Sequence, residues 1–272
     1  MKTQVEKAQR FAALHQQGCF AIPNPWDAGS ARLLETMGFE ALASTSAGFA
    51  FSLARPDMAV TREQKMEHLR TVCDAVSLPV SADLQNGFGH SPEDAARTIT
   101  LAAQAGVVGG SIEDSRGTLD DPIYDIGLAR ERVQAAVEAA RATGFAFTLT
   151  ARAENLLWGR KDLADTIRRL QAYQDAGADV LYAPGLRTAE EIHTVMQAVD
   201  RPVNVLAGVP GMELSVAQLR DLGVRRVCVG AALARAAYGT VLSAGREMLE
   251  HGTFGYAQAA PSGKVFNDIF RT

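Results

Sequence analysis

The stretch Pro79-Val80-Ser81-Ala82-Asp83 is a largely apolar run that ends in a carboxylate, and a loop with two glycines, Leu84–Gly89, follows it. Other apolar runs also end in polar residues: Ala41–Thr45 leads into Ser46, Gly110–Ile112 into Glu113, and Phe147–Ala151 into Arg152. Buried parallel strands read as short apolar runs, and a polar residue at the carboxyl end of such a strand costs stability unless it is used. The repeated pattern predicts an enzyme whose active site lies where parallel strands end.

Eight strand-like runs alternate with helical patterns, which is the number found in a (β/α)₈ TIM barrel. They cover residues 20–22, 40–45, 79–83, 110–113, 147–152, 180–183, 202–206 and 226–229. Helix starts agree with this order, because Ser91 is an N-cap candidate before a proline, and both Thr61 and Thr188 begin capping boxes. The 272 residues include no linker-like stretch, so we expect one barrel domain over residues 1–272.

Two extra helices are expected after the eighth strand, a long one within Ala231–His251 and a shorter one over Lys264–Phe270. The shorter helix carries more apolar side chains than the closing of a barrel requires, namely Val265, Phe266, Ile269 and Phe270. Such a surface packs either on a neighbouring subunit or on the chain's own barrel, and both arrangements are compatible with the pattern.

Composition limits the classes of function. The net charge is −4 with no basic cluster, which argues against nucleic acid as a partner. The three cysteines, Cys19, Cys73 and Cys228, are scattered and odd in number, which favours free thiols in a reducing compartment. No apolar run reaches the roughly 20 residues that cross a bilayer. We therefore expect a soluble cytoplasmic protein with a small-molecule partner and no membrane partner.

Asp83 and Glu113 end neighbouring predicted strands, so their carboxylates should meet at one mouth of the barrel. Hard oxygen ligands in that setting suit Mg²⁺, which keeps several of its waters. The alternative is a structural acid pair that is bonded to loop backbone or to Arg152.

Arg152 ends the fifth predicted strand and is a candidate for holding a substrate carboxylate through two parallel hydrogen bonds. It could instead form a structural salt bridge to Glu113 or Glu154. Ser46-Ala47-Gly48 follows the second strand and could present backbone N–H groups and a hydroxyl to an anion, although small residues are also what a tight turn uses.

Three further polar residues have two interpretations each. Asn204 lies inside the seventh run and could offer its amide to the ligand or be a satisfied core amide. Asp57 lies in the loop beyond the second strand, where ordinary surface polarity is common. For His90, which follows the glycine loop, a capping or solvent role is favoured over catalysis.

Several common catalytic arrangements are missing from the sequence. None of the five lysines ends a predicted strand, so a Schiff-base aldolase is disfavoured. No histidine triplet suggests zinc, and no G-x-S-x-G motif or dinucleotide-binding fingerprint is present.

These residues resemble the isocitrate lyase/phosphoenolpyruvate mutase superfamily over nearly the whole chain. The resemblance rests on Asn24–Ala28, Thr45–Gly48, Asp83–Gly89, Ser111–Asp114, Thr150–Arg152, Ala176–Asp179 and Pro202–Val205. It implies a barrel whose mouth binds Mg²⁺, or alternatively Mn²⁺, together with a 2-oxo acid or its enolate. It also implies a homo-oligomer, for which we expect a tetramer, because members of this family commonly exchange their last barrel helix.

The resemblance also implies roles for individual residues. Asp83 matches the direct metal ligand, and Glu113 matches an acid that acts largely through metal-bound water. Arg152 and the backbone at Ser46, Ala47 and Gly48 match the groups that hold the carboxylate and oxo groups of the substrate. Asp57 matches an aspartate that lies on a mobile loop near the reacting carbon in some members.

Two departures from the family pattern limit these roles. Gln85 stands where relatives usually carry an Asp or Glu of the metal site, so one negative charge is missing beside the metal. The loop Asp114–Pro122 lacks the Lys-Lys-Cys-Gly-His of isocitrate and methylisocitrate lyases, and also the lysine and asparagine of phosphonate-forming mutases. Isocitrate lyase activity in its usual form is therefore not expected.

We expect a Mg²⁺-dependent carbon–carbon lyase that acts through an enolate, with Asp57 and Arg152 as catalytic residues. Its substrate would be a 2-oxo acid or a substituted 2-hydroxy dicarboxylic acid. Decarboxylation of an oxaloacetate-like acid is one version, and cleavage of a substituted malate, as by methylisocitrate or dimethylmalate lyases, is another. The alternative is a 2-oxo-acid-binding protein of the same fold with weak or no catalysis, in which Gln85 and the missing cysteine mark a decayed site.

Overall fold

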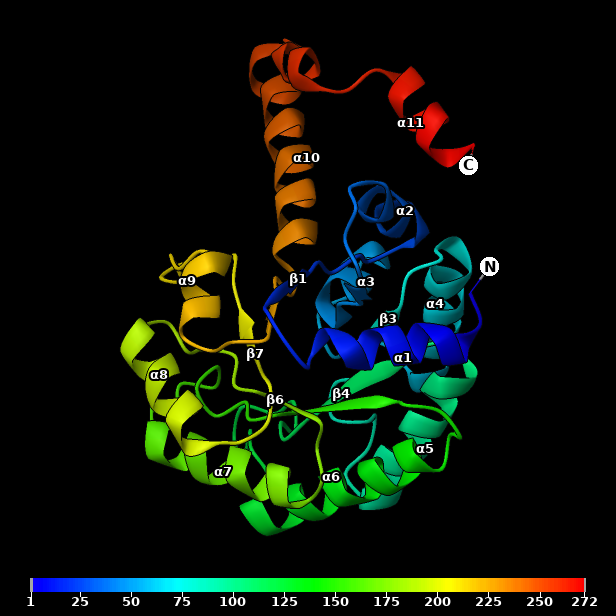
Figure 1. Ribbon diagram of the computed structural model, residues 1–272. Helices are drawn as coiled ribbons and strands as arrows, with labels where there is room; N and C mark the ends of the chain where they lie inside the picture. The colour runs from blue at the N-terminus through cyan, green and yellow to red at the C-terminus, as the bar shows by residue number, and fades with distance from the viewer. Residues whose placement is uncertain (1, 272) are drawn as a thin grey trace.

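All eight expected strands are present in the computed structural model, which describes residues 2–271 (Figure 1). They are β1 (Phe20–Ile22), β2 (Leu42–Ala43), β3 (Val80–Asp83), β4 (Gly109–Glu113), β5 (Thr148–Arg152), β6 (Val180–Tyr182), β7 (Val203–Leu206) and β8 (Arg226–Cys228). All pairings are parallel, in the order β1-β8-β7-β6-β5-β4-β3-β2. This order confirms the predicted (β/α)₈ barrel; Met1 and Thr272 of the expected 1–272 domain lie outside the described residues.

The two ends of the sheet are joined beside β1 and β2. The backbone N–H of Ala43 donates to the carbonyl of Pro23 at 3.0 Å. The Asn24 amide adds two bonds, because its Nδ2 donates to the Ser44 carbonyl at 3.3 Å and its Oδ1 accepts from the Val229 N–H at 2.9 Å. One backbone hydrogen bond and one side chain thus close the barrel between its first and last strands.

Most of the helices lie between successive strands and cover the outside of the barrel, whereas the first helix lies across one end and the last two α-helices extend beyond it (Figure 1). They are α1 (Gln4–Leu14), α2 (Ala28–Thr36), α3 (Ser46–Ser52), α4 (Arg62–Ala75), α5 (Pro92–Gln104), α6 (Ile126–Arg141), α7 (Leu163–Asp175), α8 (Ala189–Ala198), α9 (Val216–Asp221), α10 (Ala232–His251) and α11 (Gly263–Phe270), with a 3₁₀ turn at Gly255–Ala259. The predicted caps at Thr61, Ser91 and Thr188 all form capping boxes. None of the described helices is long and apolar enough to cross a membrane.

Helix α1 closes the barrel at the ends where the strands begin. Phe11 of α1 is fully buried and lies edge-on to Phe20 of β1, with ring centroids 6.4 Å apart. A Cβ atom at Gly109 of β4 would lie only 2.8 Å from the Phe11 ring, so this close approach requires glycine. The opposite end, where the strands end, is left for the site.

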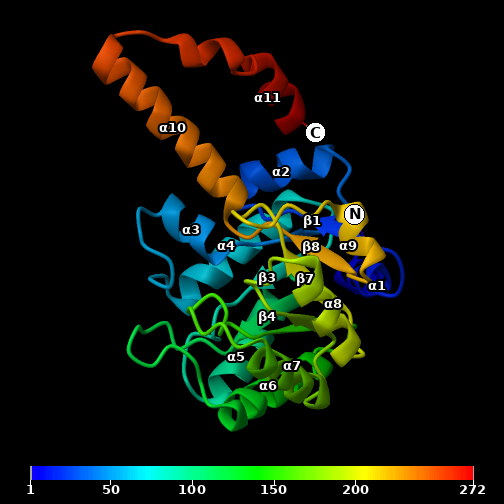
Figure 2. The same ribbon diagram turned by 90° about the vertical axis from the view of Figure 1, so that its left-hand side faces the viewer.

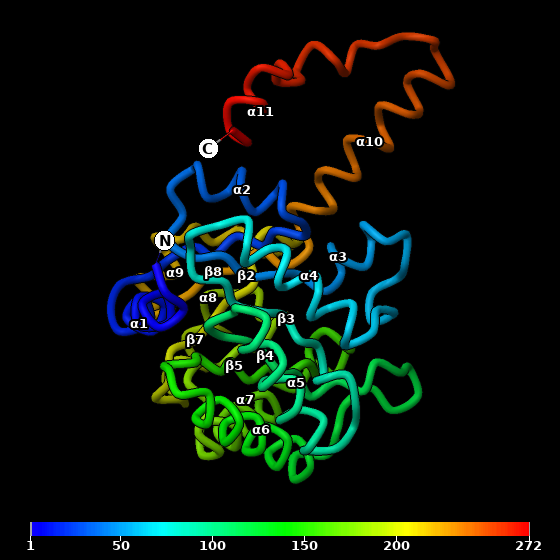
Figure 3. Tube along the Cα trace, turned by 90° about the vertical axis from the view of Figure 1, so that its right-hand side faces the viewer, coloured from blue at the N-terminus to red at the C-terminus, as the bar shows by residue number. Residues whose placement is uncertain are grey.

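The C-terminal helices extend beyond the barrel, as expected. Helix α10 leaves it as a long arm, and α11 returns beside α2 (Figures 2 and 3). The arm exposes large apolar side chains, including Leu249, which is 88% exposed, and Val241, which is 67% exposed. Within one chain, therefore, much of the arm's apolar surface is uncovered.

Candidate active site

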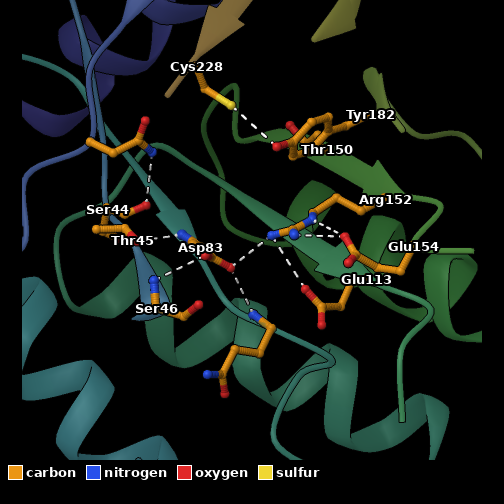
Figure 4. A network of polar contacts seen from close by, with 12 residues as sticks. Ser44, Thr45, Ser46, Asp83, Glu113, Thr150, Arg152, Glu154, Tyr182 and Cys228 are labelled. Carbon is orange, nitrogen blue, oxygen red and sulfur yellow. Dashed lines mark hydrogen bonds and ion pairs between the residues drawn. The ribbon is translucent and has the colours of Figure 1, made fainter. Parts of the chain in front are cut away.

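The predicted acids and the arginine meet at one mouth of the barrel (Figure 4). Asp83, Glu113 and Arg152 are the last residues of β3, β4 and β5. Strand register aligns Glu113 with Arg152. Parallel strands end at the same rim of a barrel, which explains why residues far apart in sequence lie together here.

Arg152 forms ion pairs with three carboxylates. Its Nη1 lies 3.2 Å from Asp83 Oδ1 and 3.4 Å from Glu113 Oε2, and its Nη2 lies 2.7 Å from Glu154 Oε1. Burial opposes its charge, but Glu154, Glu113 and then Asp83 raise the pKa of Arg152 well above the usual value. The salt bridges that were the alternative to carboxylate binding are thus present in the site.

Asp83 is held by a network that includes a lysine which the sequence analysis did not place in the site. Asp83 accepts hydrogen bonds from the backbone N–H groups of Ser46, at 3.1 Å, and Gln85, at 3.2 Å. Its own N–H donates to Ser44 Oγ at 3.0 Å, and Lys65 Nζ donates to the same oxygen at 3.1 Å. Burial disfavours ionised Asp83, but Arg152 and then Lys65 lower its pKa.

Lys65 is fully buried on α4, and burial lowers its pKa to about 8 against the opposing charges of Asp83 and Asp57. A sequence signal for it existed, because Lys65 falls among the residues of α4 that face the barrel, with Met66 and Leu69. A lysine in an apolar helix stripe needs a polar partner, and here the partner is Ser44.

Glu154 was expected only as a possible salt-bridge partner of Arg152, and it also lines the site. It follows Arg152 by two positions, the spacing that puts side chains on the same side of an extended chain. Burial raises the pKa of Glu154, and burial together with Glu154 and Asp83 raises that of Glu113, both against the effect of Arg152. Carboxyl groups with raised pKa values are suited to holding or passing a proton.

Ser46, Ala47 and Gly48 form the first turn of α3 rather than a tight turn, and Thr45 is the N-cap. The Ser46 N–H donates to Asp83 and the Gly48 N–H to Thr45 Oγ1 at 3.3 Å. A Cβ atom at Gly48 would lie 2.6 Å from the Thr45 side chain and 2.9 Å from that of Trp26, so the position requires glycine for packing. Among described residues no acceptor is bonded to the Ala47 N–H, which remains available to a ligand.

Two adjoining cavities form the mouth, of about 240 Å³ and about 300 Å³. Ser46, Asp57, Leu157 and Arg152 line both. The first also contains Ala47, Asp83 and Asn204, and the second contains Glu113 and Glu154. Arg152 therefore stands between the two, with Asp83 on one side and Glu113 on the other.

Two predicted site residues lie outside these cavities. Gly48 is buried and lines neither cavity. Gln85 lines a neighbouring cavity of about 480 Å³ together with His90 and Arg116. The buried Gln85 Nε2 has no hydrogen-bond partner among the described residues, so this amide is not committed to the surrounding protein. The role of Gln85 in metal binding and the role of Gly48 in substrate binding remain predictions.

The three remaining candidates differ in their exposure and in their hydrogen-bond partners; they are Asp57, Asn204 and His90. Asp57 is exposed in the loop between α3 and α4, yet partial removal from water and the charge of Asp83 raise its pKa. The Asn204 amide is occupied, because Oδ1 accepts from Arg226 Nε at 2.9 Å and Nδ2 donates to Cys228 Sγ at 3.1 Å. His90 is exposed and bonds to the Tyr124 hydroxyl at 2.7 Å.

The donor set fits a hydrated divalent cation better than a caged one. Within residues 2–271 no group of three or more Asp, Glu, His or Cys side chains is placed to hold a metal ion. Mg²⁺ commonly takes one or two carboxylates and retains waters. Four carboxylates, Asp57, Asp83, Glu113 and Glu154, face the two cations Arg152 and Lys65. Of these four groups only Asp83 has a lowered pKa, so Asp83 is the carboxylate best suited to hold a cation.

A (β/α)₈ barrel with acids, an arginine and a free backbone N–H at the strand ends is typical of enzymes that act on small anions. The chain belongs to the phosphoenolpyruvate phosphomutase family, whose sequence profile matches residues 11–249. The superfamily indicated by the sequence motifs is thereby confirmed.

Curated relatives support the enzyme class. A probable 2-methylisocitrate lyase 2 from Corynebacterium glutamicum is 32% identical over 250 residues, which cover 88% of this chain and 79% of that protein. An oxaloacetate decarboxylase from Bradyrhizobium diazoefficiens is 30% identical over 201 residues, covering 71% of this chain and 67% of that protein. Both names agree with the predicted class of carbon–carbon lyase.

Solved structures of related proteins share the whole fold. A protein from Burkholderia cenocepacia J2315, provisionally assigned as a lyase or mutase, is 57% identical with a TM-score of 0.97 over 99% of this chain and 98% of its own. A phosphonopyruvate hydrolase in complex with oxalate and Mg²⁺ is 26% identical with a TM-score of 0.85 over 97% of this chain and 94% of its own.

Proposed function

We propose that this protein is a Mg²⁺-dependent carbon–carbon lyase for a 2-oxo acid or a substituted 2-hydroxy dicarboxylic acid. One observation carries the proposal: Arg152 lies in contact with Asp83 and Glu113 at a cavity that also presents the free Ala47 N–H. Carboxylate oxygens that could bind a cation and N–H groups that could bind a carboxylate therefore lie around one cavity of a size that suits a small acid.

Asp83 would hold Mg²⁺ directly, and Glu113 and Gln85 would act through its waters. Mn²⁺, which accepts similar oxygen ligands, is an alternative. When bound, the metal would supply positive charge where negative charge develops on the substrate oxygen. The oxalate and Mg²⁺ bound by the related phosphonopyruvate hydrolase support this assignment.

Arg152 would bind and orient the substrate carboxylate together with the Ala47 N–H, since its guanidinium can donate two parallel hydrogen bonds. Its charge would also stabilise an enolate product. Asp57 lines both cavities from a loop, and its raised pKa suits a group that passes a proton at the reacting carbon. Burial of Glu113 and Glu154 would keep protons from escaping to bulk water.

The two expected reactions share these parts. Decarboxylation of an oxaloacetate-like acid leaves CO₂ and the enolate of a 2-oxo acid. Retro-aldol cleavage of a substituted malate leaves a 2-oxo acid and the enediolate of a second carboxylic acid, so in both reactions negative charge develops on substrate oxygen atoms. The related oxaloacetate decarboxylase supports the first and the 2-methylisocitrate lyase the second. The loop Asp114–Pro122 contains no cysteine, which weighs against the usual isocitrate lyase chemistry.

A binding protein without catalysis is the second candidate, because Gln85 is neutral and Arg152 is already paired with three carboxylates. Purified protein should be given a panel of 2-oxo and 2-hydroxy diacids with Mg²⁺ or with EDTA, and products followed by NMR. Mg²⁺-dependent loss of one acid supports the lyase. Tight binding of 2-oxo acids without turnover supports the binding protein.

We further propose a cytoplasmic homotetramer of single barrel domains in which α10 and α11 pack across a subunit interface. The uncovered apolar side chains of the arm support this arrangement. The three free cysteines support a reducing compartment.

A further inference from the structure

Arg226 is a buried arginine inside the barrel that neither the motifs nor the proposed reaction uses. It is the first residue of β8 and is only 5% exposed. It nevertheless lines the same cavity of about 240 Å³ as Arg152 and Asp83. Because β8 begins at Arg226 whereas β5 ends at Arg152, Arg226 lies deeper in the barrel than the mouth.

No anion compensates the charge of Arg226. Its Nε donates to Asn204 Oδ1 at 2.9 Å and its Nη2 to Thr150 Oγ1 at 3.0 Å, both neutral acceptors. Its Nη1 has no hydrogen-bond partner, and within residues 2–271 no carboxylate forms an ion pair with it. A buried, unpaired charge is strongly unfavourable.

Of the three other buried arginines among the described residues, two have ion pairs and one, Arg132, has only neutral partners. Arg62 pairs with Asp94, Arg169 pairs with Asp114, and Arg132 donates to the carbonyls of Ser91 and Asn86 and lies over the Tyr124 ring. Burial lowers the pKa of Arg132 and that of Arg226, the latter to about 10. Of the two buried arginines in the described part of the chain that lack an ion pair, Arg226 is the one that lines the cavity at the mouth, where an external anion could reach it.

The surroundings of Arg226 are polar where barrel interiors usually hold bulky branched side chains. Ser81, Ser111, Asn204 and Cys228 line the cavity beside it. Thr150, Tyr182 and Cys228 form a polar group apart from the three carboxylates (Figure 4). Asn204 Oδ1 accepts a hydrogen bond from Arg226 Nε and so fixes the plane of the guanidinium. This contact explains why a polar residue lies within the apolar seventh strand.

We propose that Arg226 binds a second carboxylate of the substrate, which makes the preferred ligand a compact dicarboxylate with one end near Arg152 and the other deep in the barrel. The identity of this ligand rests on the proposed function. Thr150, which contacts Arg226, lies two residues below Arg152 on β5, about 7 Å along the strand. A four-carbon diacid has about this length.

The test compares lactate with malate, which differ only in that malate carries a second carboxylate. Calorimetry should show that the parent protein binds malate at least about tenfold more tightly than lactate, a ratio of the size that a charge-assisted hydrogen bond produces. Arg226→Met should remove this preference and Arg226→Lys should keep part of it. Arg225→Met is the matched control, because Arg225 contacts the Gly18 carbonyl instead of the cavity.

An inorganic anion is the other source of the same chemistry. If the malate preference is absent but chloride raises the Tm of the parent protein and not that of Arg226→Met, Arg226 is an anion site for an inorganic ion and the dicarboxylate assignment falls. If the parent protein shows neither a malate preference nor an Arg226-dependent chloride effect, Arg226 has a structural role only and the inference is overturned.

If Arg226→Met fails to fold, the malate preference and the chloride effect can still be measured in the parent protein. Arg226→Lys then serves as the variant with which the parent is compared. Neither readout depends on turnover. A malate preference that depends on Arg226 in a protein that cleaves no diacid would refute the lyase and leave this inference standing.

Discussion

The Nη1 of Arg152 lies 3.2 Å from the Oδ1 of Asp83, although the two residues are 69 positions apart in sequence. This contact joins the proposed metal ligand to the proposed carboxylate binder. A cation bound at Asp83 would replace the charge that Arg152 now supplies and would free the guanidinium for the substrate. We therefore expect Mg²⁺ and a 2-oxo acid to strengthen each other's binding, as reciprocal linkage requires. Pyruvate titrations with and without Mg²⁺ measure this coupling, and equal affinities would contradict it.

Arg152→Lys should weaken pyruvate binding by about 1.5–3 kcal/mol, the scale of a charge-assisted hydrogen bond. Lysine keeps the charge but cannot form two parallel hydrogen bonds to one carboxylate. Calorimetry in the presence of Mg²⁺ checks this, with the exposed Arg160→Lys as control. If Arg152→Lys binds as well as the parent, Arg152 serves only in structural salt bridges.

Gln85→Glu should tighten Mg²⁺ binding, because it adds a negative charge near the cation. Calorimetry of Mg²⁺ alone measures the change. Gln85→Met is the matched control, since it removes the amide without adding charge and should not tighten binding. Unchanged or weaker Mg²⁺ binding by Gln85→Glu would remove position 85 from the metal site.

The barrel could be predicted because its signals are local: apolar runs, capping residues and polar strand ends each occupy a few consecutive residues. The same signals identified Asp83, Glu113 and Arg152. The predicted length of the second strand was wrong, because the strand was expected over residues 40–45 but covers only Leu42–Ala43. The reason is that Thr45 caps α3, so the chain has already turned into a helix at Ser46.

The residues that were missed depend on contacts between distant elements. Lys65 reaches Ser44 from α4, and Arg226 reaches Thr150 across the barrel. Neither contact corresponds to a motif or a regular residue spacing that could be recognised in the sequence. Asn204 was noticed for its position, but its partners, Arg226 and Cys228, lie on the next strand and become evident only from the register of β7 and β8.

His15 should make the protein sensitive to acid. It is 4% exposed and bonds through Nδ1 to the Phe11 carbonyl, and burial and then Arg226 lower its pKa to about 3. The unfolded chain, in which a histidine pKa is about 6.5, therefore takes up the proton first as the pH falls. Stability is lost between pH 6.5 and pH 3, by about 2 kcal/mol at pH 5.

His15→Leu removes this proton-linked loss. Urea unfolding at pH 7 and pH 5 should show that the free energy of unfolding of the variant, relative to the parent, improves by about 2 kcal/mol at the lower pH. His193→Leu, at an exposed histidine, is the control and should show no such change. An equal difference at both pH values for His15→Leu would show that His15 is not the group responsible.

Light scattering at micromolar concentration should report a tetramer. Leu249→Glu, which places a charge on the arm at an 88% exposed position, should disrupt the assembly. Leu119→Glu changes a residue of similar exposure, 87%, in the loop after β4 and should leave the tetramer intact. A monomeric parent protein would rule out the arm as a subunit interface.

The most direct test of the proposed lyase is the Mg²⁺ dependence of diacid turnover in the parent protein and in Asp83→Asn. The substitution removes the charge of the proposed direct metal ligand while keeping the size of a side chain that ends a strand, so the fold should persist by circular dichroism. The account predicts turnover in the parent that requires Mg²⁺ and is abolished in a folded Asp83→Asn variant. Full, Mg²⁺-dependent turnover by Asp83→Asn would contradict it.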